Sequence, residues 1–365
     1  MNGVRRRSPF SGFTIHDSPF TIEMRCLVDR LATRLACAVV AVVLGSATLV
    51  IAQGTPKNYS PPRTPWGDPD LQGTWPGTDL VGVPLQRDPK YGTRNRLTEE
   101  EFLARESQFA KQEETDNADF DPEHPAGNPG DVGSPTSPPP HWLERGKPQY
   151  IASLIVDPPD GRMPPATTES QQRTAAATAA RRGRGPADSY TDRSLYDRCI
   201  TRGVAGSMLP VIYNNGNDIV QAPGYVVLRN EMIHEARVVP LDGRPHAGRD
   251  VRMWMGDSRG HWDGDTLVVE TTNFDPRTSG VGPNGGGRVS EDLKIVERIT
   301  RVSPDQLIWR MTFDDPKTWT RAFTIELPLR RDDTYGMFEY ACHEGNYALR
   351  NILSAARAEE AAAKK

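Results

Sequence analysis

Short runs of alternating apolar and polar residues fill the chain from Asn214 onward, with turn residues between them every ~8–12 positions. Asn215-Gly216, Pro223-Gly224 and Asp263-Gly264 are typical turn sequences, because Gly and Asn tolerate positive φ and Pro presets φ for a turn. Such spacing is typical of all-β sandwiches and barrels. The sequence therefore predicts a mainly β fold over residues 191–365, an antiparallel meander that closes into a barrel and ends in a helix.

The same alternation predicts which side chains face the interior, because successive side chains in a strand point to opposite faces. The run 307–313 has an uncharged apolar face that includes Trp309. Three ionisable side chains fall on apolar faces: His234 in 231–239, Glu297 in 293–301 and Arg321 in 319–329. Glu297 and Arg321 are interpreted either as a buried ion pair that specifies the core, or as a site where Arg321 binds a ligand carboxylate.

Residues 53–190 are predicted to form an irregular, partly helical extension packed on the barrel. Thr98 and Glu101 have capping-box spacing ahead of apolar residues, which predicts a helix over about 98–114. A second helix is expected over about 168–181. The chain is expected to end in a helix from about Tyr347, because four apolar residues follow helical spacing: Leu349, Ile352, Leu353 and Ala356.

Residues 1–52 are interpreted as a signal peptide, with Met24 as a possible true start. The segment 36–52 is apolar, arginines precede it, and Val50-x-Ala52 is a cleavage pattern before Gln53. The alternative is an uncleaved membrane anchor, because the apolar run is near the short limit for a span. Cleavage predicts a periplasmic or extracellular protein with no membrane span.

The two cysteines that remain after cleavage are Cys199 and Cys342. An even pair of thiols in an exported protein predicts a disulfide, because oxidising compartments allow the bond to form and persist.

Charge and motif content exclude several classes of function. The formal net charge is −4 and the pI is about 6.0, which argues against a nucleic-acid-binding surface. Gly285-Gly286-Gly287 lacks the spacing of a phosphate or dinucleotide loop, and no serine lies in a Gly-x-Ser-x-Gly elbow. The histidine spacings match no metal motif. We therefore expect no cofactor and no metal.

Four histidines are candidates for chemistry, because histidine is the usual acid or base near neutral pH. His234, His246, His261 and His343 are expected to converge with Glu235, Asp257 or Glu344, with structural support for loops as the alternative. In the segment 257–262, Arg259 and His261 are candidates to bind an anionic or polyhydroxylated ligand, with Trp262 as a stacking wall. The alternative is that Asp257 and Arg259 pair to fix this loop while Trp262 fills the core.

Five blocks resemble a large family of exported bacterial proteins of unknown function: Trp66–Trp75, Asp157–Pro165, Ser194–Pro210, Asp257–Asn273 and Glu339–Asn346. This resemblance covers nearly the whole mature chain and implies export, but no activity. In addition, Gly73-x-Trp75, the β-meander and the C-terminal helix resemble a lipocalin-type (calycin) barrel, which implies an interior that holds a ligand. The long insertion 76–190 departs from that second pattern.

These observations lead to three hypotheses of function. The first is an exported small-molecule-binding protein of the cell envelope with an apolar or amphipathic ligand, contacted by Arg321, Trp309, Arg259, Trp262, His246 and His343. The alternative is a periplasmic hydrolase, lyase or isomerase that uses His234 with His261 or Glu297. The third is a structural envelope module. In the first two, His234 is expected to be buried and to border the main pocket with Arg321 and Trp309. The sequence assigns no oligomeric state.

Overall fold

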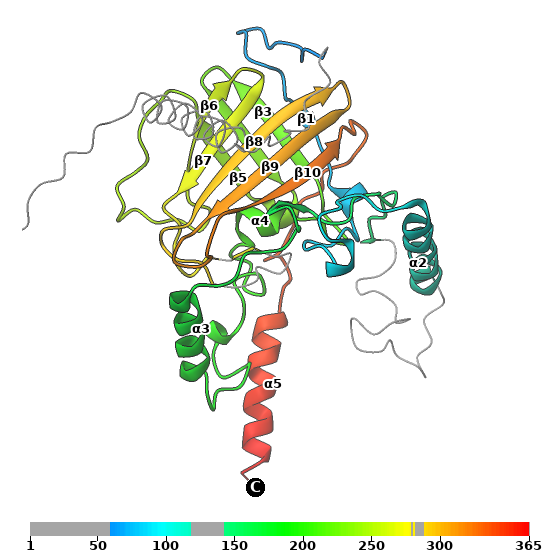
Figure 1. Ribbon diagram of the computed structural model, residues 1–365. Coiled ribbons are helices and arrows are strands. Elements are labelled where there is room, and N and C mark those ends of the chain that lie inside the picture. Colours follow the sequence, from blue (N-terminus) through cyan, green and yellow to red (C-terminus); the bar gives the residue numbers. More distant parts are fainter. Residues whose placement is uncertain (1–58, 118–141, 279, 282–287, 365) are drawn as a thin grey trace, which may run out of the picture. The chain divides into compact units, whose positions relative to one another are not determined.

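The strands of the protein pair into two antiparallel sheets, one of four strands and one of six (Figure 1). The computed structural model describes residues 59–117, 142–278, 280, 281 and 288–364. All of these belong to one compact unit, residues 58–365. The predicted signal peptide, 1–52, lies outside the described residues, so its cleavage stays a prediction.

The four-stranded sheet has the order β1-β3-β4-β5. Its strands are β1 (Gly73–Thr74), β3 (Asn217–Ala222), β4 (Tyr225–Asn230) and β5 (Ala236–Pro240). Gly224 has a φ of +78° in the turn between β3 and β4, a conformation that glycine adopts without a steric penalty. The predicted Pro223-Gly224 turn therefore joins these two strands.

The six-stranded sheet has the order β2-β10-β9-β8-β7-β6. Its strands are β2 (Ile155–Asp157), β6 (Asp257–Asp263), β7 (Thr266–Thr272), β8 (Lys294–Ser303), β9 (Gln306–Asp314) and β10 (Phe323–Arg330). Strands β6 to β10 follow one another in space as they do in sequence, which is the predicted meander. Both sheets take one edge strand, β1 or β2, from the segment 53–190.

Four α-helices accompany the sheets in the described chain: α2 (Glu99–Asn117), α3 (Thr168–Ala180), α4 (Gly203–Met208) and α5 (Ala348–Ala362). The predicted capping box of α2 is confirmed, because the Glu101 amide donates to Thr98 Oγ1 and the Thr98 amide donates to a Glu101 carboxylate oxygen. All six residues of α4 are buried. None of the described helices combines the length and the apolar composition that a membrane span requires.

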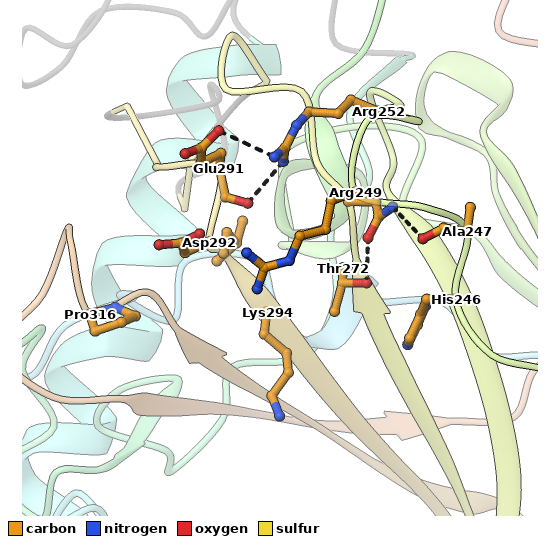
Figure 2. A pocket seen from close by; sticks show the side chains of 11 residues that line it. His246, Ala247, Arg249, Arg252, Thr272, Glu291, Asp292, Lys294 and Pro316 are labelled. Atoms are coloured by element: carbon orange, nitrogen blue, oxygen red, sulfur yellow. Dashed lines mark hydrogen bonds and ion pairs between the residues drawn. The ribbon is translucent and has the colours of Figure 1, made fainter.

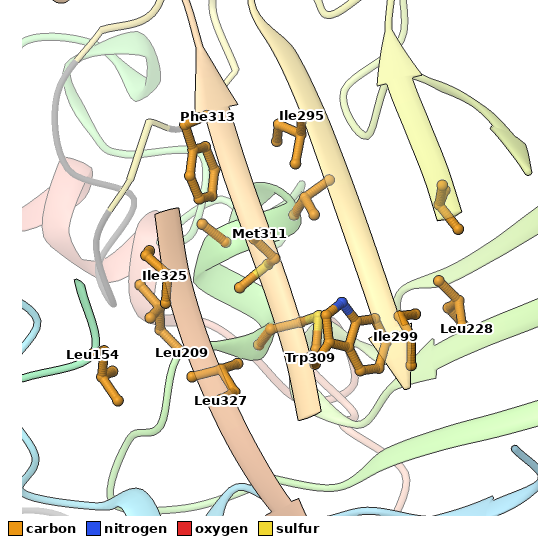
Figure 3. Close-up of a cluster of buried hydrophobic side chains, with 14 of the residues drawn as sticks. Leu154, Leu209, Leu228, Ile295, Ile299, Trp309, Met311, Phe313, Ile325 and Leu327 are labelled. Carbon is orange, nitrogen blue, oxygen red and sulfur yellow. The ribbon is translucent and has the colours of Figure 1, made fainter. Parts of the chain in front are cut away.

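The core lies on the inner faces of the two sheets and is packed with side chains (Figure 3). The predicted apolar face of 307–313 is confirmed, because all four of its residues are at most 1% exposed: Leu307, Trp309, Met311 and Phe313. Phe323 of β10 stacks on Phe313 with ring centroids 5.2 Å apart. Fully burying an apolar side chain of this size stabilises the fold by about 1.5–3 kcal/mol relative to exposure.

The predicted closure into one barrel is not found, because no hydrogen-bonded ladder joins the two sheets within the described residues. The physical reason lies between β5 and β6. The side chains of Val239 and Leu241 lie directly over Gly260 of β6, where an added Cβ would come within 2.8 and 2.7 Å of them. At this point β5 and its continuation present side chains, rather than backbone donors and acceptors, to β6.

The predicted register of 231–239 is wrong. Met232–His234 form a 3₁₀ turn in which Ile233 and His234 have positive φ values, so alternation begins only with β5. A shift of one residue reverses every side chain in a strand. Arg237 and Val239 therefore face the core, while Val238 is 59% exposed and His234 is exposed.

The predicted inward position of Arg321 is also wrong. Residues 315–322 form a turn and an irregular segment, and β10 begins only at Phe323. The Arg321 side chain is 54% exposed and pairs with Asp157 at 3.0 Å. Glu297, in contrast, is fully buried as predicted.

The predicted disulfide is confirmed. Cys199 and Cys342 are bonded, with their Cα atoms 5.7 Å apart and a sequence separation of 143. A disulfide is consistent with an oxidising compartment.

Candidate functional site

A cleft of about 540 Å³ opens at one end of the six-stranded sheet (Figure 2). Four segments contribute to its walls: the connection 241–256 between β5 and β6, the end of β7, the start of β8 with the residues before it, and Pro316 between β9 and β10. Its charged lining residues are His246, Arg249, Arg252, Glu291, Asp292 and Lys294. A cleft of this volume lies within the usual range for small-molecule sites.

Asn273 shapes the loop that carries the cleft's first wall. It follows β7 in a left-handed conformation, with φ of +59°, which Asn adopts more readily than most residues. Its Nδ2 lies 3.0, 2.9 and 3.0 Å from the carbonyl oxygens of Ala247, Gly248 and Val251. One side-chain amide therefore holds the loop that contains Arg249.

His246 lies between two carboxylates on this wall. Its Nδ1 is 3.2 Å from Asp257 Oδ2 and its Nε2 is 3.3 Å from Glu270 Oε1. Each ring nitrogen thus lies within hydrogen-bond distance of one carboxylate oxygen, and these two contacts fix the orientation of the ring. Asp257 is itself fixed, because it also accepts from the Ala247 amide at 2.8 Å and from Arg259.

Most charges around the cleft are paired. Arg252 lies 3.2 Å from Glu291, Lys294 lies 3.2 Å from Glu270, and Lys317 lies 2.8 Å from Asp292. Arg249 differs, because it forms no hydrogen bond or salt bridge with any residue of the described chain. Figure 2 shows its guanidinium extending into the cleft on the side of Asp292 and Lys294.

Nearby cations lower the pKa of two carboxyl groups in or beside the cleft. The hydrogen bond from Lys317 holds the pKa of Asp292 below its ordinary value, and the charge of Arg249 acts in the same direction. At Glu270, partial burial alone would raise the pKa. The hydrogen bond and charge of Lys294, with a smaller contribution from His246, reverse that effect and leave the pKa lowered.

This arrangement suits a ligand that carries both an anionic group and hydroxyls. A guanidinium without a protein partner can bind a carboxylate or phosphate through two parallel hydrogen bonds. Lys294 adds positive charge nearby. The carboxylates of Asp292 and Glu291 are acceptors for hydroxyl groups.

Two of the predicted site residues meet at this cleft. His246 lines it, and Arg259 supports it from behind by donating to Asp257 and to the Pro245 carbonyl. The Asp257–Arg259 pair is thus the loop-fixing contact that the sequence offered as one alternative. His261 is exposed on β6, and Trp262 packs against the core while its Nε1 has no hydrogen-bond partner in the described chain.

Two other predicted site residues lie together in the core. Trp309 Nε1 donates to Glu297 Oε1 at 3.0 Å, and the ion-pair partner of Glu297 is Arg237, not the predicted Arg321. Neither Glu297 nor Trp309 lines the cleft, and no histidine contacts Glu297 in the described chain.

The remaining predicted histidines lie near the disulfide. His234 Nδ1 is 2.9 Å from the Tyr340 carbonyl oxygen, and His343 is exposed beside Cys342. Neither lines the cleft. The prediction that a buried His234 borders the main pocket with Arg321 and Trp309 is therefore wrong, because the turn at Ile233 turns this side chain outward.

The sequence analysis did not identify Arg249, Lys294, Glu270 or Asn273 as parts of a site. One signal was present for Asn273, since an Asn directly after the apolar run of β7 is suited to left-handed backbone. The others are charged residues at strand ends and in a loop, which the alternation of polar and apolar residues does not distinguish from ordinary surface positions.

Comparison with known proteins found no matching family model, curated protein or solved structure. The resemblances to an exported family and to lipocalin-type barrels therefore stay predictions. Any functional assignment depends on the geometry and chemistry of the chain itself.

Proposed function

We propose that the protein is an exported small-molecule-binding protein of the cell envelope, and that its ligand is an acidic sugar or a related polyhydroxylated anion. The observation that carries the proposal is Arg249, a cation that extends into a cleft without a hydrogen bond or salt bridge to the described chain. An unpaired guanidinium beside Lys294 is suited to a ligand carboxylate.

The rest of the lining supports a ligand with hydroxyl groups. Glu291 and Asp292 each retain acceptor capacity, because a carboxylate accepts several hydrogen bonds and each of these is engaged on only part of its oxygen lone pairs. A purely anionic ligand would gain nothing from these two carboxylates. A sugar acid presents one anionic group to Arg249 and several hydroxyl donors to the carboxylates.

The packed interior disfavours the apolar ligand expected from the sequence. The inner faces of the two sheets are filled by side chains such as Trp309 and Met311, each at most 1% exposed (Figure 3). The cleft of about 540 Å³ described above, here called the His246 cleft, lies outside that core and is lined mainly by charged and polar side chains. These observations favour a polyhydroxylated anion in the His246 cleft over an apolar ligand inside the sheets.

Isothermal titration calorimetry with galacturonate tests this proposal. Galacturonate is expected to bind, while galactose, which lacks the carboxylate, is expected to bind at least tenfold more weakly. Arg249→Gln removes the charge-assisted bonds, which are worth about 1.5–3 kcal/mol, and should weaken binding by tenfold or more. Arg350→Gln, at an exposed position on α5, is the matched control and should bind as the wild type does. Equal binding of the two sugars, or an unchanged Arg249→Gln, would contradict the proposal.

A second candidate function is acid–base catalysis at the same cleft, favoured by the position of His246 between Asp257 and Glu270. A carboxylate that orients an imidazole is a common arrangement for proton transfer. If the cleft is catalytic, His246→Asn abolishes turnover of a bound uronate, followed by proton NMR, and leaves its binding within a few-fold. Absence of turnover by the wild type would rule this candidate out.

Export is part of the proposal and has its own test. The disulfide supports it, because such bonds are rare in reducing compartments. N-terminal sequencing of the mature protein from its own host should begin at Gln53. An intact leader in the purified envelope fraction would instead support the membrane-anchor alternative.

A further inference from the structure

A second cleft, of about 490 Å³, adjoins the first. Helix α3 contributes Glu169 and Arg173 to its lining, and the segment after β7 contributes Arg277. Arg288 and Lys317 are the other two cations of its lining. Four cations thus line a cleft in a protein whose formal net charge is −4.

The two clefts adjoin at the segment before β8. Glu291 lines both of them. Pro316 lines the first and Lys317 lines the second, and the Lys317 ammonium lies 2.8 Å from Asp292 in the first cleft. Glu291 therefore lies at the boundary that the two clefts share.

Each cleft contains one guanidinium that has no hydrogen bond or salt bridge to the described part of the chain. Arg249 has none in the first cleft, and Arg288 forms no hydrogen bond or salt bridge with a described residue in the second. The other arginines of the second cleft are engaged, Arg173 with Glu169 and Arg277 with Asp275. The carboxylates of Glu291 and Asp292 both lie within 3.5 Å of the Lys317 ammonium, which offsets part of their negative charge.

We infer that the two clefts form one groove and that the groove binds an acidic oligosaccharide, with one carboxylate at Arg249 and another at Arg288. This inference rests on the proposed function and extends it from a single sugar acid to a chain of them. The repeating unit of such a chain carries an anionic group for each free guanidinium and hydroxyls for Glu291. A nucleic acid strand carries the repeated charge but offers few hydroxyl donors, so the carboxylates along the floor favour the glycan.

The test is a length series of oligogalacturonides, from one to six residues, measured by calorimetry. Affinity is expected to rise at least tenfold between the monomer and the longer oligomers, because the second carboxylate reaches Arg288 only in a chain. Arg288→Gln should remove that gain and leave monomer binding unchanged. Arg249→Gln should weaken all lengths, and Arg350→Gln should change none. Melting temperatures establish that each variant is folded.

The possible outcomes distinguish the extended groove from the proposed binding of a single sugar acid. Monomer binding that depends on Arg249, with no increase along the series and no effect of Arg288→Gln, overturns the extended groove and leaves the proposed function intact. Absence of binding by the monomer and by every oligomer overturns both. A single-stranded oligodeoxynucleotide of the same charge that binds more tightly than the hexamer overturns the assignment to a glycan.

Discussion

Arg237 of β5 and Glu297 of β8 form a buried, two-bonded ion pair that joins the two sheets. The guanidinium nitrogens lie 2.5 and 2.8 Å from the two carboxylate oxygens, and Trp309 donates a third bond to the same carboxylate. Arg237 is 5% exposed and Glu297 is fully buried. The contact connects two sheets that share no backbone ladder in the described chain.

Breaking this pair on one side should be costly. Glu297→Gln keeps the shape of the side chain but leaves the Arg237 charge buried without a counter-charge, and such changes cost about 3–5 kcal/mol. Urea unfolding followed by tryptophan fluorescence measures this loss. A double variant, Arg237→Met with Glu297→Leu, is the matched control, because replacing both charges with apolar groups is often neutral or stabilising. A Glu297→Gln protein as stable as the wild type would show that the pair contributes nothing.

The disulfide should contribute substantially to stability. Removing a native disulfide from a small secreted domain typically costs 2–5 kcal/mol, and the Cys199–Cys342 bond spans 143 positions. We expect Cys199→Ala with Cys342→Ala to unfold at a correspondingly lower urea concentration. Reduction of the wild type should reproduce the loss and should leave the double variant unchanged. An unaltered unfolding midpoint after complete reduction would contradict this prediction.

Asn273 should support both stability and ligand binding. Asn273→Gly keeps the positive φ accessible but removes the two N–H donors that three carbonyl oxygens of the 247–251 loop share, and a typical hydrogen bond contributes about 0.5–1.5 kcal/mol. Asn273→Ala also has a side chain in the left-handed region, which costs about 1–2 kcal/mol more. Unfolding free energies should therefore fall in the order wild type, Gly, Ala. Equal stabilities for the Gly and Ala variants would contradict the positive φ.

Glu235 predicts a pH dependence of stability. Burial raises the pKa of this carboxyl above its ordinary value of 4.5, and hydrogen bonding by Thr201 offsets the shift only in part. The folded state then binds more protons than the unfolded state, so this contribution to stability is full below the ordinary pKa and is lost as the pH rises through the folded-state pKa. The change in melting temperature caused by Glu235→Gln should therefore be more positive at pH 7 than at pH 4.

The exposed Glu359 of α5 provides the matched control for this measurement. Glu359→Gln should give the same change in melting temperature at both pH values. A Glu235→Gln effect that is also the same at pH 4 and pH 7 would show that burial does not penalise the ionised Glu235.

The long strands were predictable from the sequence, because alternation over many residues leaves one register that buries the apolar set. The run 307–313 is an example, since all its apolar residues lie on the buried face. The helix α2 was predictable from Thr98 and Glu101 for a local reason, the capping box. The disulfide followed from a count, because only Cys199 and Cys342 remain once the predicted leader is removed.

Positions next to irregular backbone were not predictable in the same way. Ile233 adopts a φ of +58°, which is unusual for a β-branched residue, and this turn reverses the faces of His234 and Arg237. The alternation therefore predicts Arg321 as the cation of the core ion pair, whereas the structure has Arg237 in that place. The His246 cleft depends on contacts between strand ends and a loop, such as His246 with Glu270, which no periodic pattern encodes.

A crystal structure of the protein with galacturonate tests the central claim most directly. We expect the sugar in the His246 cleft, with its carboxylate hydrogen-bonded to the Arg249 guanidinium and its hydroxyls directed to Asp292 or Glu291. A sugar bound elsewhere, with the His246 cleft empty and Arg249 without contact to the carboxylate, would contradict it.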